Sequence, residues 1–381
     1  MKRRLLLACL PALACWVPSH AAPRPTHFPD AGAAPDAATV QVDTIVEGLE
    51  HPWGLALLPD GRMLVTERPG RLRLVGPDGK LGPPLAGLPE IAARGQGGLL
   101  DVVVDPEFGR NQTIYFSYSE PGEGGAGTAV ARARLGDQGL TELKVIFRQQ
   151  PKVGGGGHFG SRLVFGRDGT LFITLGDRFG HRERAQDLST TIGKVVRLHT
   201  DGRIPKDNPF VNRKDALPEI WSYGHRNVQA AALHPATGEL WTVEHGARGG
   251  DELNRVRPGL NFGWPVITYG TDYSGAKIGN GTEAAGMEQP LHYFDPSIAP
   301  SGMVFYTGKL FPQWQGDILV GALAKTHLAR LQLKDGRVVA EHRYLQHLGE
   351  RIRDVRQGPE GELWLLTDSP KGKLLRLRPK R

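Results

Sequence analysis

The sequence predicts an all-β fold, a six-bladed β-propeller built from four-stranded antiparallel sheets. Short apolar runs recur along the chain with turn signals between them. The 51 glycines and 29 prolines lie between these runs, which is typical of many turns rather than of disorder. Long helical periodicity is absent, and 381 residues are enough for one large β domain.

A repeated hairpin indicates the number of blades. Each copy has an apolar strand, a turn rich in Pro, Asp and Gly, a second apolar strand and, in most copies, a final acidic or polar residue. The six copies span residues 54–67, 99–118, 162–177, 229–244, 303–320 and 354–368. Repeats at intervals of about 40 to 70 residues are typical of radial β-proteins.

Further strands are expected to complete the blades and close the ring. Outer strands are predicted at residues 72–75, 130–133 and 327–331. The N-terminal strand at 40–46 is expected to pair with the last blade at 374–377. A β-sandwich or two barrels is the alternative, and the regular recurrence of six similar hairpins disfavours it. Long insertions at 178–222 and 268–300 are expected to decorate one face and to carry function.

The N-terminus has the features of an export signal. Three basic residues precede an apolar stretch at 5–17, which is too short for a stable membrane anchor, and a small-x-small pattern follows. We therefore expect a signal peptide (residues 1–21), a flexible N-terminal segment (22–39) and a propeller domain (40–381). The expected location is the periplasm or the exterior, without stable membrane insertion.

Cysteine usage and charge exclude several function classes. Both cysteines, Cys9 and Cys15, lie within the signal, so no thiol or disulfide chemistry is expected of the mature chain. The formal net charge of +7 falls to +4 without the signal. Basic residues are scattered rather than in runs, which disfavours nucleic acid as a partner.

Unusual polar residues share one phase of the repeat. Four of them lie eight to ten residues before a hairpin turn, namely Gln96, His158, Arg226 and Arg351. Asp177 and Glu244 end the second strands of their hairpins. An antiparallel hairpin returns to the end where it began, so all six residues are expected at one mouth of the central channel, with Asp177 beside His158.

This set of residue types favours a particular chemistry. Guanidinium groups bind carboxylates bidentately and therefore suit a polycarboxylate ligand. A histidine held by a carboxylate suits general-base catalysis. The plainer interpretation is that these residues only make turn hydrogen bonds, and their common phase disfavours it.

The motifs around these positions resemble the soluble PQQ-dependent aldose sugar dehydrogenases of the glucose/sorbosone dehydrogenase group, where PQQ is pyrroloquinoline quinone. The resemblance extends from about residue 40 to residue 378. It is carried by residues 95–100, 158–163 with 176–177, 224–227, 244–252, 261–265 and 351–354. Their order, spacing and blade phase together make the resemblance specific.

The resemblance implies roles for the catalytic residues. His158 is the base that takes the proton of the sugar's anomeric hydroxyl, and Asp177 orients it. Hydride passes from C1 of the sugar to C5 of the quinone, and Arg226 stabilises the charge that develops on the quinone oxygen. An aldose is thereby oxidised to its lactone, and the electrons pass to an unidentified acceptor.

The resemblance also implies two cofactors. PQQ contacts are expected from Gln96, His158, Arg226, Asn227, Ser297, Lys325, Arg351 and Arg353. A calcium ion at the quinone is expected on the main-chain oxygens of Gly246 and Ala247, because hard oxygen donors suit Ca²⁺. A second, structural calcium is expected on Glu252 and the main-chain oxygen of Phe262.

Two departures from the family pattern affect these expectations. Ala247 stands where the family commonly has proline, a change that leaves the backbone oxygen in place. Ser297 stands in a loop where glucose dehydrogenases have threonine and a nearby tryptophan, so the sequence does not identify the sugar.

Two other functions stay open. A calcium-dependent propeller hydrolase, such as a lactonase, needs side-chain carboxylates and amides around a channel metal, and this mouth is richer in arginine. A propeller that only binds sugars or proteins is the second. Either a monomer or a homodimer is expected.

Overall fold

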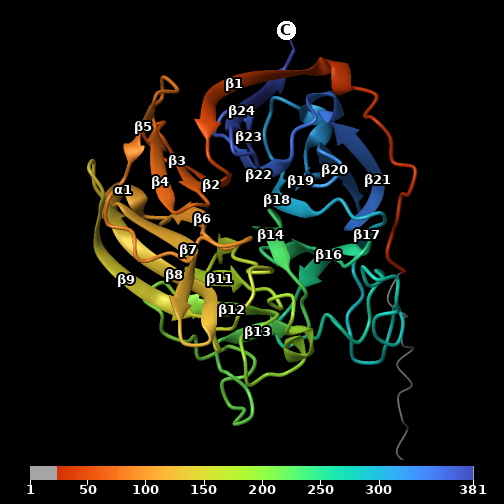
Figure 1. Ribbon diagram of the computed structural model, residues 1–381. Coiled ribbons are helices and arrows are strands. Elements are labelled where there is room, and N and C mark those ends of the chain that lie inside the picture. The colour runs from red at the N-terminus through yellow and green to blue at the C-terminus, as the bar shows by residue number, and fades with distance from the viewer. Residues whose placement is uncertain (1–23, 381) are drawn as a thin grey trace, which may run out of the picture.

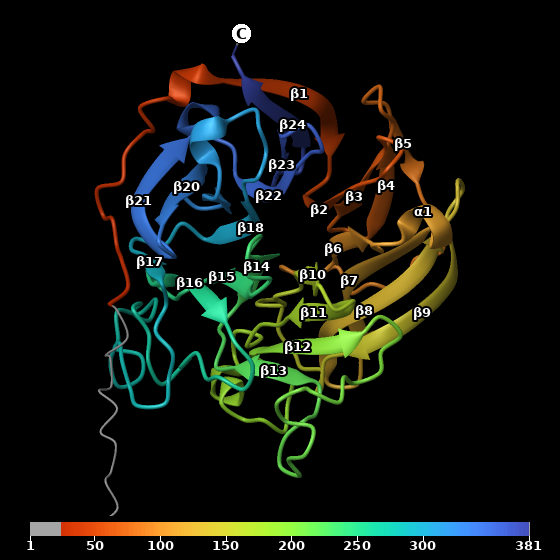
Figure 2. The same cartoon turned by 180° about the vertical axis from the view of Figure 1, so that it is seen from behind.

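The computed structural model describes residues 24–380, which form six four-stranded antiparallel sheets arranged around a central axis (Figures 1 and 2). One four-residue α-helix, α1 (Phe108–Asn111), and four single 3₁₀ turns are the helices of this part of the chain. The predicted all-β, six-bladed propeller is therefore confirmed.

Each blade except the last uses four strands consecutive in sequence. Blade 1 holds β2 (Pro52–Leu57), β3 (Met63–Glu67), β4 (Arg71–Val75) and β5 (Leu81–Pro84), and blade 2 holds β6 (Leu99–Val104), β7 (Thr113–Gly122), β8 (Gly125–Leu135) and β9 (Leu140–Arg148). Blade 3 holds β10 (Leu163–Phe165), β11 (Thr170–Thr174), β12 (Lys194–His199) and β13 (Ile220–Tyr223), and blade 4 holds β14 (Val228–Leu233), β15 (Leu240–Glu244), β16 (Asp251–Val256) and β17 (His292–Phe294). Blade 5 holds β18 (Pro300–Phe305), β19 (Ile318–Ala322), β20 (His327–Lys334) and β21 (Arg337–Tyr344), and blade 6 holds β22 (Ile352–Gln357), β23 (Leu363–Thr367), β24 (Gly372–Pro379) and β1 (Val40–Leu49).

The first strand of each hairpin lies innermost. β2, β6, β10, β14, β18 and β22 surround the axis, and neighbours in this series contact one another (Figure 2). Each of the six predicted hairpins falls on the first two strands of one blade. The residues that enter these strands are therefore brought to the axis from six separate parts of the chain.

The ring is closed by strands from both ends of the chain. β1 pairs with β24 in antiparallel register, with Val42 opposite Leu377 and Val46 opposite Leu374 (Figure 1). This pairing confirms the predicted closure. It supplies the fourth strand of blade 6, whose edge would otherwise be open to pairing with another chain.

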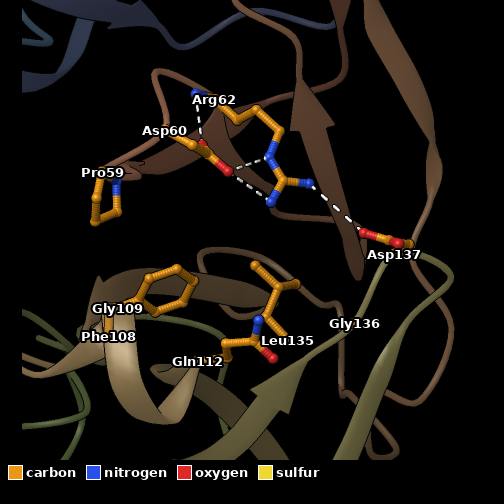
Figure 3. Close-up of a pocket in the computed structure, with 9 residues that line it drawn as sticks. All are labelled: Pro59, Asp60, Arg62, Phe108, Gly109, Gln112, Leu135, Gly136 and Asp137. Atoms are coloured by element: carbon orange, nitrogen blue, oxygen red, sulfur yellow. Dashed lines mark hydrogen bonds and ion pairs between the residues drawn. The ribbon is translucent and has the colours of Figure 1, made fainter.

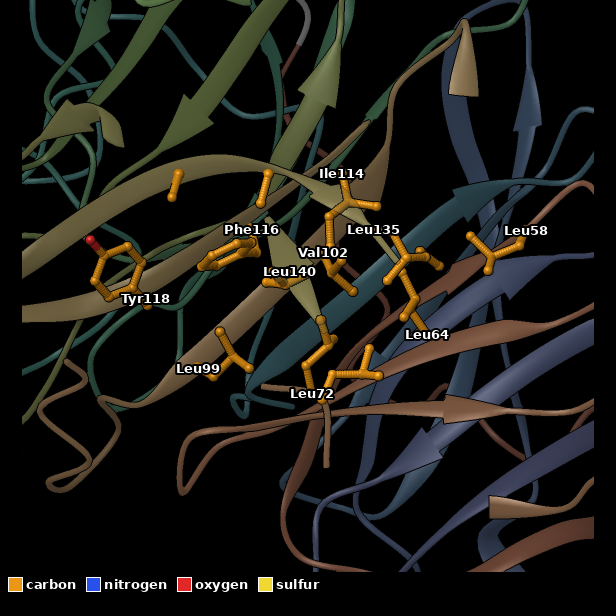
Figure 4. Packing of buried hydrophobic residues seen from close by; sticks show 14 of the residues in the cluster. Leu58, Leu64, Leu72, Leu99, Val102, Ile114, Phe116, Tyr118, Leu135 and Leu140 are labelled. Carbon is orange, nitrogen blue, oxygen red and sulfur yellow. The ribbon is translucent and has the colours of Figure 1, made fainter. Parts of the chain in front are cut away.

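The hydrophobic core lies mainly between the blades. Leu64 and Leu72 of blade 1 pack in one cluster with Leu99 and Phe116 of blade 2, and all four are fully buried (Figure 4). Alternate strand residues face opposite sides of a sheet, so each blade covers a neighbour on both faces. The site therefore rests on a closed ring of mutually packed sheets.

The long insertions contain the outer strands of two blades. Residues 178–222 hold β12, most of β13 and a 3₁₀ turn, η2 (Arg182–Ala185), and residues 268–300 hold β17. The rest of both insertions is irregular and contributes loops around the site described below.

The chain before β1 runs along the outside of blades 4 and 5. Thr26 donates its backbone N–H to the carbonyl of Leu291, and Ala34 donates to that of Arg343. A 3₁₀ turn, η1 (Ala37–Thr39), leads into β1. The predicted signal peptide at 1–21 lies outside the described residues. Within residues 24–380, no helix is both long and apolar enough to cross a membrane.

Candidate active site

His158 and Asp177 form a buried pair at the axis end of blade 3. His158 precedes β10 and Asp177 follows β11, so the antiparallel hairpin returns the carboxylate to the histidine. Nδ1 of His158 lies 2.6 Å from Oδ1 of Asp177, and both side chains are almost fully buried. The structure therefore places Asp177 beside His158, as the antiparallel hairpin predicts.

The backbone of His158 is held in an unusual conformation by its neighbours. Its φ of +51° lies in the left-handed region, which is costly for a residue other than glycine. Oε1 of Gln96 accepts the backbone N–H of His158 at 2.8 Å. A Cβ at position 176 would overlap the carbonyl oxygen of His158, so only glycine fits there. Gln96, one of the predicted cofactor residues, thus also fixes the loop that carries the histidine.

The surroundings of His158 keep its ring neutral. Burial lowers the pKa of His158, although the hydrogen bond and the charge of Asp177 act in the opposite direction. The positive charges of Arg226 and Arg178 lower the pKa further. An ionised carboxylate only accepts hydrogen bonds, so Nδ1 carries the proton and Nε2 keeps its lone pair. Nε2 is therefore the atom that can accept a proton from a ligand.

Asp177 also contacts a residue that sequence reasoning did not select. The indole Nε1 of Trp264 donates to Oδ2 of Asp177 at 2.8 Å, and the guanidinium carbon of Arg226 lies 5.1 Å from the centroid of the Trp264 ring. Trp264 lies in one of the segments that carry the family resemblance, 261–265, but its loop follows β16 in blade 4 and no periodicity links it to blade 3. It connects the pair with Arg226.

Blade 4 contains a similar histidine–carboxylate pair, but this pair has a structural role. Nδ1 of His225 lies 2.9 Å from Oε1 of Glu244, and the backbone N–H of Arg226 donates to the other carboxylate oxygen at 2.6 Å. Nε2 of His225 contacts the hydroxyl of Ser222. His225 and Ser222 are fully buried and cannot meet a ligand. This chain of contacts fixes the backbone that presents Arg226.

Further arginines reach the same region from blade 6. Arg353 is buried and donates to Oε1 of Gln229 and to Asp368, while Arg351 donates to the carbonyl of Leu323 and to Asp368. Burial alone would raise the pKa of Asp368, but the charge of Arg353 and hydrogen bonds from His51 and Arg353 hold that pKa well below its usual range. Asp368 follows β23 as Asp177 follows β11.

His245 shows that blades 3, 4 and 6 converge. Its ring is largely but not fully buried, and burial together with the nearby His158, Arg226 and Arg353 lowers the pKa of His245 to about 3. Its Nε2 contacts the carbonyl of Pro300 at 2.6 Å. A neutral imidazole thus lies close to His158 and Arg226, which the repeat placed at one mouth, and to Arg353, which the resemblance placed in the cofactor site.

The remaining predicted PQQ contacts are placed differently. Oδ1 of Asn227 accepts the backbone N–H of Gly160, which ties Asn227 to the histidine loop. The hydroxyl of Ser297 lies 2.8 Å from Oδ2 of Asp251, so it is engaged in the turn that precedes β18. Lys325 is exposed in the β19–β20 turn, with a left-handed φ of +68°.

Buried donors without partners surround the mouth. Nε of Arg226, Nδ2 of Asn227 and Nε of Arg353 are buried and have no hydrogen-bond partner. Leaving such donors unpaired costs about 1–3 kcal/mol each, and more for charged groups. An anionic ligand with several oxygen acceptors would satisfy them, and a polycarboxylate such as PQQ fits this donor set.

The two predicted calcium sites adjoin a small cavity below Arg226. The cavity is lined by Arg226, Glu244, His245, Gly246, Gly250, Glu252, Phe262, Trp264, Ile267 and Thr268. The carbonyl oxygen of Gly246 faces this region and accepts a hydrogen bond from Arg226, and Ala247 follows in the same turn. Main-chain oxygens are thus available there, although no three His, Cys, Asp or Glu side chains converge as metal ligands anywhere in residues 24–380.

Glu252 has the surroundings of a carboxylate that needs a cation. Burial and the neighbouring Glu244 raise the pKa of Glu252 to about 8. The amide of Asn254 contacts both carboxylates, and Arg226, the one arginine or lysine that lines the cavity, donates to Gly246 instead. Glu252 is only partly exposed and lies beside a second acid, and a carboxyl group in such surroundings favours a bound proton or a bound cation. Glu252 and the oxygen of Phe262 therefore fit the expected calcium.

Another pocket lies at the opposite rim of the propeller. It is lined by Pro59, Asp60, Arg62, Phe108, Gly109, Gln112, Leu135, Gly136 and Asp137, at the turn ends of blades 1 and 2 (Figure 3). Arg62 pairs with Asp60 at 2.7 Å and with Asp137 at 3.8 Å. It contains none of the predicted site residues, so substitutions there are suitable controls.

Fold and site together define a β-propeller enzyme, with a histidine–aspartate pair and several arginines at one mouth of its channel. Comparison with known proteins narrows this class. The chain belongs to the Glucose / Sorbosone dehydrogenase family, whose model matches residues 49–376. The chain is therefore an oxidoreductase.

Relatives of the chain are similar over nearly their whole lengths. The aldose sugar dehydrogenase YliI of Escherichia coli is 48% identical over 354 residues, which cover 91% of this chain and 95% of that protein. The crystal structure of the soluble E. coli aldose sugar dehydrogenase in its apo form has a TM-score of 0.88 at 47% identity and covers 90% of this chain and 100% of that one. The PQQ-bound aldose sugar dehydrogenase of Streptomyces coelicolor has a TM-score of 0.75 at 27% identity, with 91% and 99% covered.

Proposed function

We propose that this protein oxidises aldose sugars at C1 to the corresponding lactones, with PQQ and calcium bound at the mouth that carries His158. The observation that carries the proposal is the 2.6 Å contact between Nδ1 of His158 and Asp177 on a buried, neutral ring. The similarity to aldose sugar dehydrogenases over most of the chain supports this substrate class.

The proton transfer follows from the geometry of the pair. Nε2 of His158 takes the proton of the anomeric hydroxyl as the C1–O bond becomes a carbonyl and hydride leaves C1. Asp177 stabilises the imidazolium that forms and keeps Nε2 directed at the sugar. When bound, PQQ supplies a quinone carbonyl that takes up two electrons, and calcium supplies a Lewis acid that polarises this carbonyl.

The cofactor is held by the cationic and amide groups around the pair. Arg226, Arg351, Arg353 and Lys325 offer positive charge to its carboxylates, and Gln96, Asn227 and Ser297 offer polar contacts. The unpaired buried donors of Arg226, Asn227 and Arg353 support this assignment. The carbonyl oxygens of Gly246 and Ala247 hold the calcium at the quinone, and Glu252 with Phe262 holds a second ion.

The remaining expectations complete the proposal. The mature enzyme begins after a signal peptide at residues 1–21 and acts in the periplasm or outside the cell. A short N-terminal segment at 22–39 precedes the propeller domain at 40–381, and its residues Thr26 and Ala34 hydrogen-bond to the outside of the propeller. The enzyme is a monomer or a homodimer that binds no nucleic acid, and it passes electrons to an acceptor that awaits identification.

Reconstitution of the apo-protein tests the proposal. We expect PQQ with Ca²⁺ to give aldose-dependent bleaching of an artificial redox dye, and neither component alone to suffice. Metal-dependent lactone opening without PQQ would instead indicate a propeller hydrolase. The absence of both activities, with retained binding of a sugar or protein, would indicate a binding propeller. Arg62→Ala, at the opposite rim, is the matched control and should reconstitute normally.

A further inference from the structure

Two exposed aromatic side chains stand beside the catalytic pair and have no role in the mechanism above. Five large hydrophobic side chains are exposed in residues 24–380, and the two most exposed are Tyr273 at 61% and Phe179 at 58%. The rings of these two lie 6.4 Å apart and nearly parallel, and Phe179 also contacts the ring of His158 at 5.0 Å. Exposed apolar surface at an active site is typical of a ligand-binding wall.

Phe179 is held outward by a strained turn. Arg178 and Phe179 have successive left-handed φ angles of +57° and +62°. Arg178 is almost fully buried, lies over the ring of Phe159 and donates to the carbonyls of Gly155 and Gly157. Strain of this kind persists only where the surroundings impose it, and it is concentrated at functional sites. Packing alone would bury Phe179 rather than expose it.

The carboxylate of Asp177 couples this turn to the base. Its Oδ1 accepts the backbone N–H of Phe179 at 2.8 Å and also contacts Nδ1 of His158 at 2.6 Å. One oxygen atom thus fixes both the imidazole and the aromatic ring beside it. The position of Phe179 relative to the reacting atoms is therefore set by the catalytic machinery itself.

Tyr273 reaches the same place from blade 4. Its loop is anchored where Thr271 and Arg248 exchange backbone hydrogen bonds, and Asp272 faces Arg182 of the blade 3 loop at 3.8 Å. Stacked aromatic pairs elsewhere in the molecule approach to 4.1 and 4.2 Å, as in Phe311 with Trp314 and Tyr269 with Tyr293. The looser spacing of Phe179 and Tyr273 leaves ring surface free for a ligand.

We propose that Phe179 and Tyr273 form the wall of the sugar-binding subsite and pack against the C–H face of the pyranose ring whose C1 faces His158. This inference rests on the proposed function and names the residues that select its substrate. A pyranose has apolar C–H groups on its ring faces, and aromatic rings bury such groups with little loss of side-chain entropy. A redox dye or natural acceptor is the competing occupant.

Steady-state kinetics with both substrates varied test the wall. In Tyr273→Ala we expect KM for glucose to rise about five- to thirtyfold with kcat within about twofold, because the lost contact is equal in the ground and transition states. Tyr273→Phe keeps the ring and should keep KM. Phe179→Ala should also raise KM and, through its contact with His158, lower kcat. Val339→Ala, an exposed apolar residue on β21, is the matched control and should change neither constant.

A binding measurement makes the result independent of turnover. Saturation-transfer NMR with 1-deoxyglucose, which lacks the anomeric hydroxyl, should show transfer to sugar C–H protons in the parent protein and in Tyr273→Phe, and its loss in Tyr273→Ala. An unchanged glucose KM and unchanged saturation transfer in both alanine variants would refute the proposed role of Phe179 and Tyr273 in sugar binding. The dehydrogenase proposal would remain intact. A rise confined to the acceptor's KM would also refute the role in sugar binding. If the parent protein oxidises no aldose, the proposed function fails, and the NMR result alone decides the wall.

Discussion

Trp264 donates its indole N–H to Oδ2 of Asp177 at 2.8 Å, across a separation of 87 residues in the chain. The contact joins a loop of blade 4 to the acid of blade 3. Since Oδ1 of the same carboxylate holds His158, the orientation of the base depends on two blades at once. Loss of either contact should therefore affect catalysis before it affects the fold.

Replacing the base should remove most of the turnover without releasing the cofactor. His158→Ala is expected to lower kcat by about 10²–10⁴-fold, the usual cost of losing a positioned base. PQQ titration monitored by absorbance should show near-normal binding, because the arginines remain. A correctly folded variant with an unchanged rate would remove His158 from this role.

Removing two arginines should weaken cofactor binding, in contrast to the loss of turnover expected for the histidine variant. Arg351→Ala combined with Arg353→Ala is expected to weaken PQQ binding at least about tenfold, since charge-assisted contacts to carboxylates are lost. Titration of the apo-protein measures this affinity. Arg62→Ala removes a cation at the opposite rim (Figure 3) and should leave PQQ affinity unchanged. Equal losses in both variants would indicate a general electrostatic effect instead.

Trp264 should act as a positioning residue. Trp264→Phe removes the hydrogen bond to Asp177 and is expected to lower kcat about tenfold, which corresponds to about 1.4 kcal/mol. The less satisfied carboxylate should stabilise the imidazolium more, so the acid limb of the pH–rate profile should move to higher pH. Trp364→Phe, whose indole donates to Glu362 in blade 6, is the control. A fall in kcat without movement of this limb would indicate a purely structural role.

The pH dependence of the parent enzyme should reflect the burial of His158. The base must be neutral, and burial lowers its pKa below the ordinary value of about 6.5. Activity should therefore persist below pH about 6.5 and disappear as the pH falls through the lowered pKa. The profile of kcat/KM for the sugar, measured with excess acceptor, checks this. An acid limb above pH 7 would contradict it.

Calcium should stabilise the fold through Glu252. Without a cation, burial and the neighbouring Glu244 raise the pKa of this carboxyl group and so favour its protonated form, and calcium binding should displace the proton. Adding Ca²⁺ to chelator-treated protein is expected to raise Tm, more so at pH 8 than at pH 6. Glu252→Gln should reduce the rise, whereas Glu341→Gln, at a buried acid of blade 5, should retain it. An equal rise in both variants would place the stabilising ion elsewhere.

The fold was predictable because the sequence pattern that specifies each blade lies within a short stretch of the chain. Each blade begins with a hairpin whose strands are close in sequence, so the repeated strand–turn–strand pattern marks all six blades. The acid that follows β11 and the acid that ends β15 are placed by the register of these hairpins. The adjacency of His158 and Asp177 is of this kind, since one hairpin carries both. Family resemblance then supplied the cofactors and residue roles, which composition and periodicity do not contain.

The contacts between loops of different blades were not predictable. Three contacts join segments that no repeat relates: Trp264 with Asp177, Tyr273 with Phe179, and Ser297 with Asp251. The packing of Glu252 beside Glu244 also depends on how those loops pack. The sequence by itself determined the ring of blades and the residue types at its mouth, because strand pairing within a blade is short-range. Only the tertiary structure decided which side chains are buried together and therefore which protons and charges they hold, because burial and pKa depend on neighbours that the chain brings from distant positions.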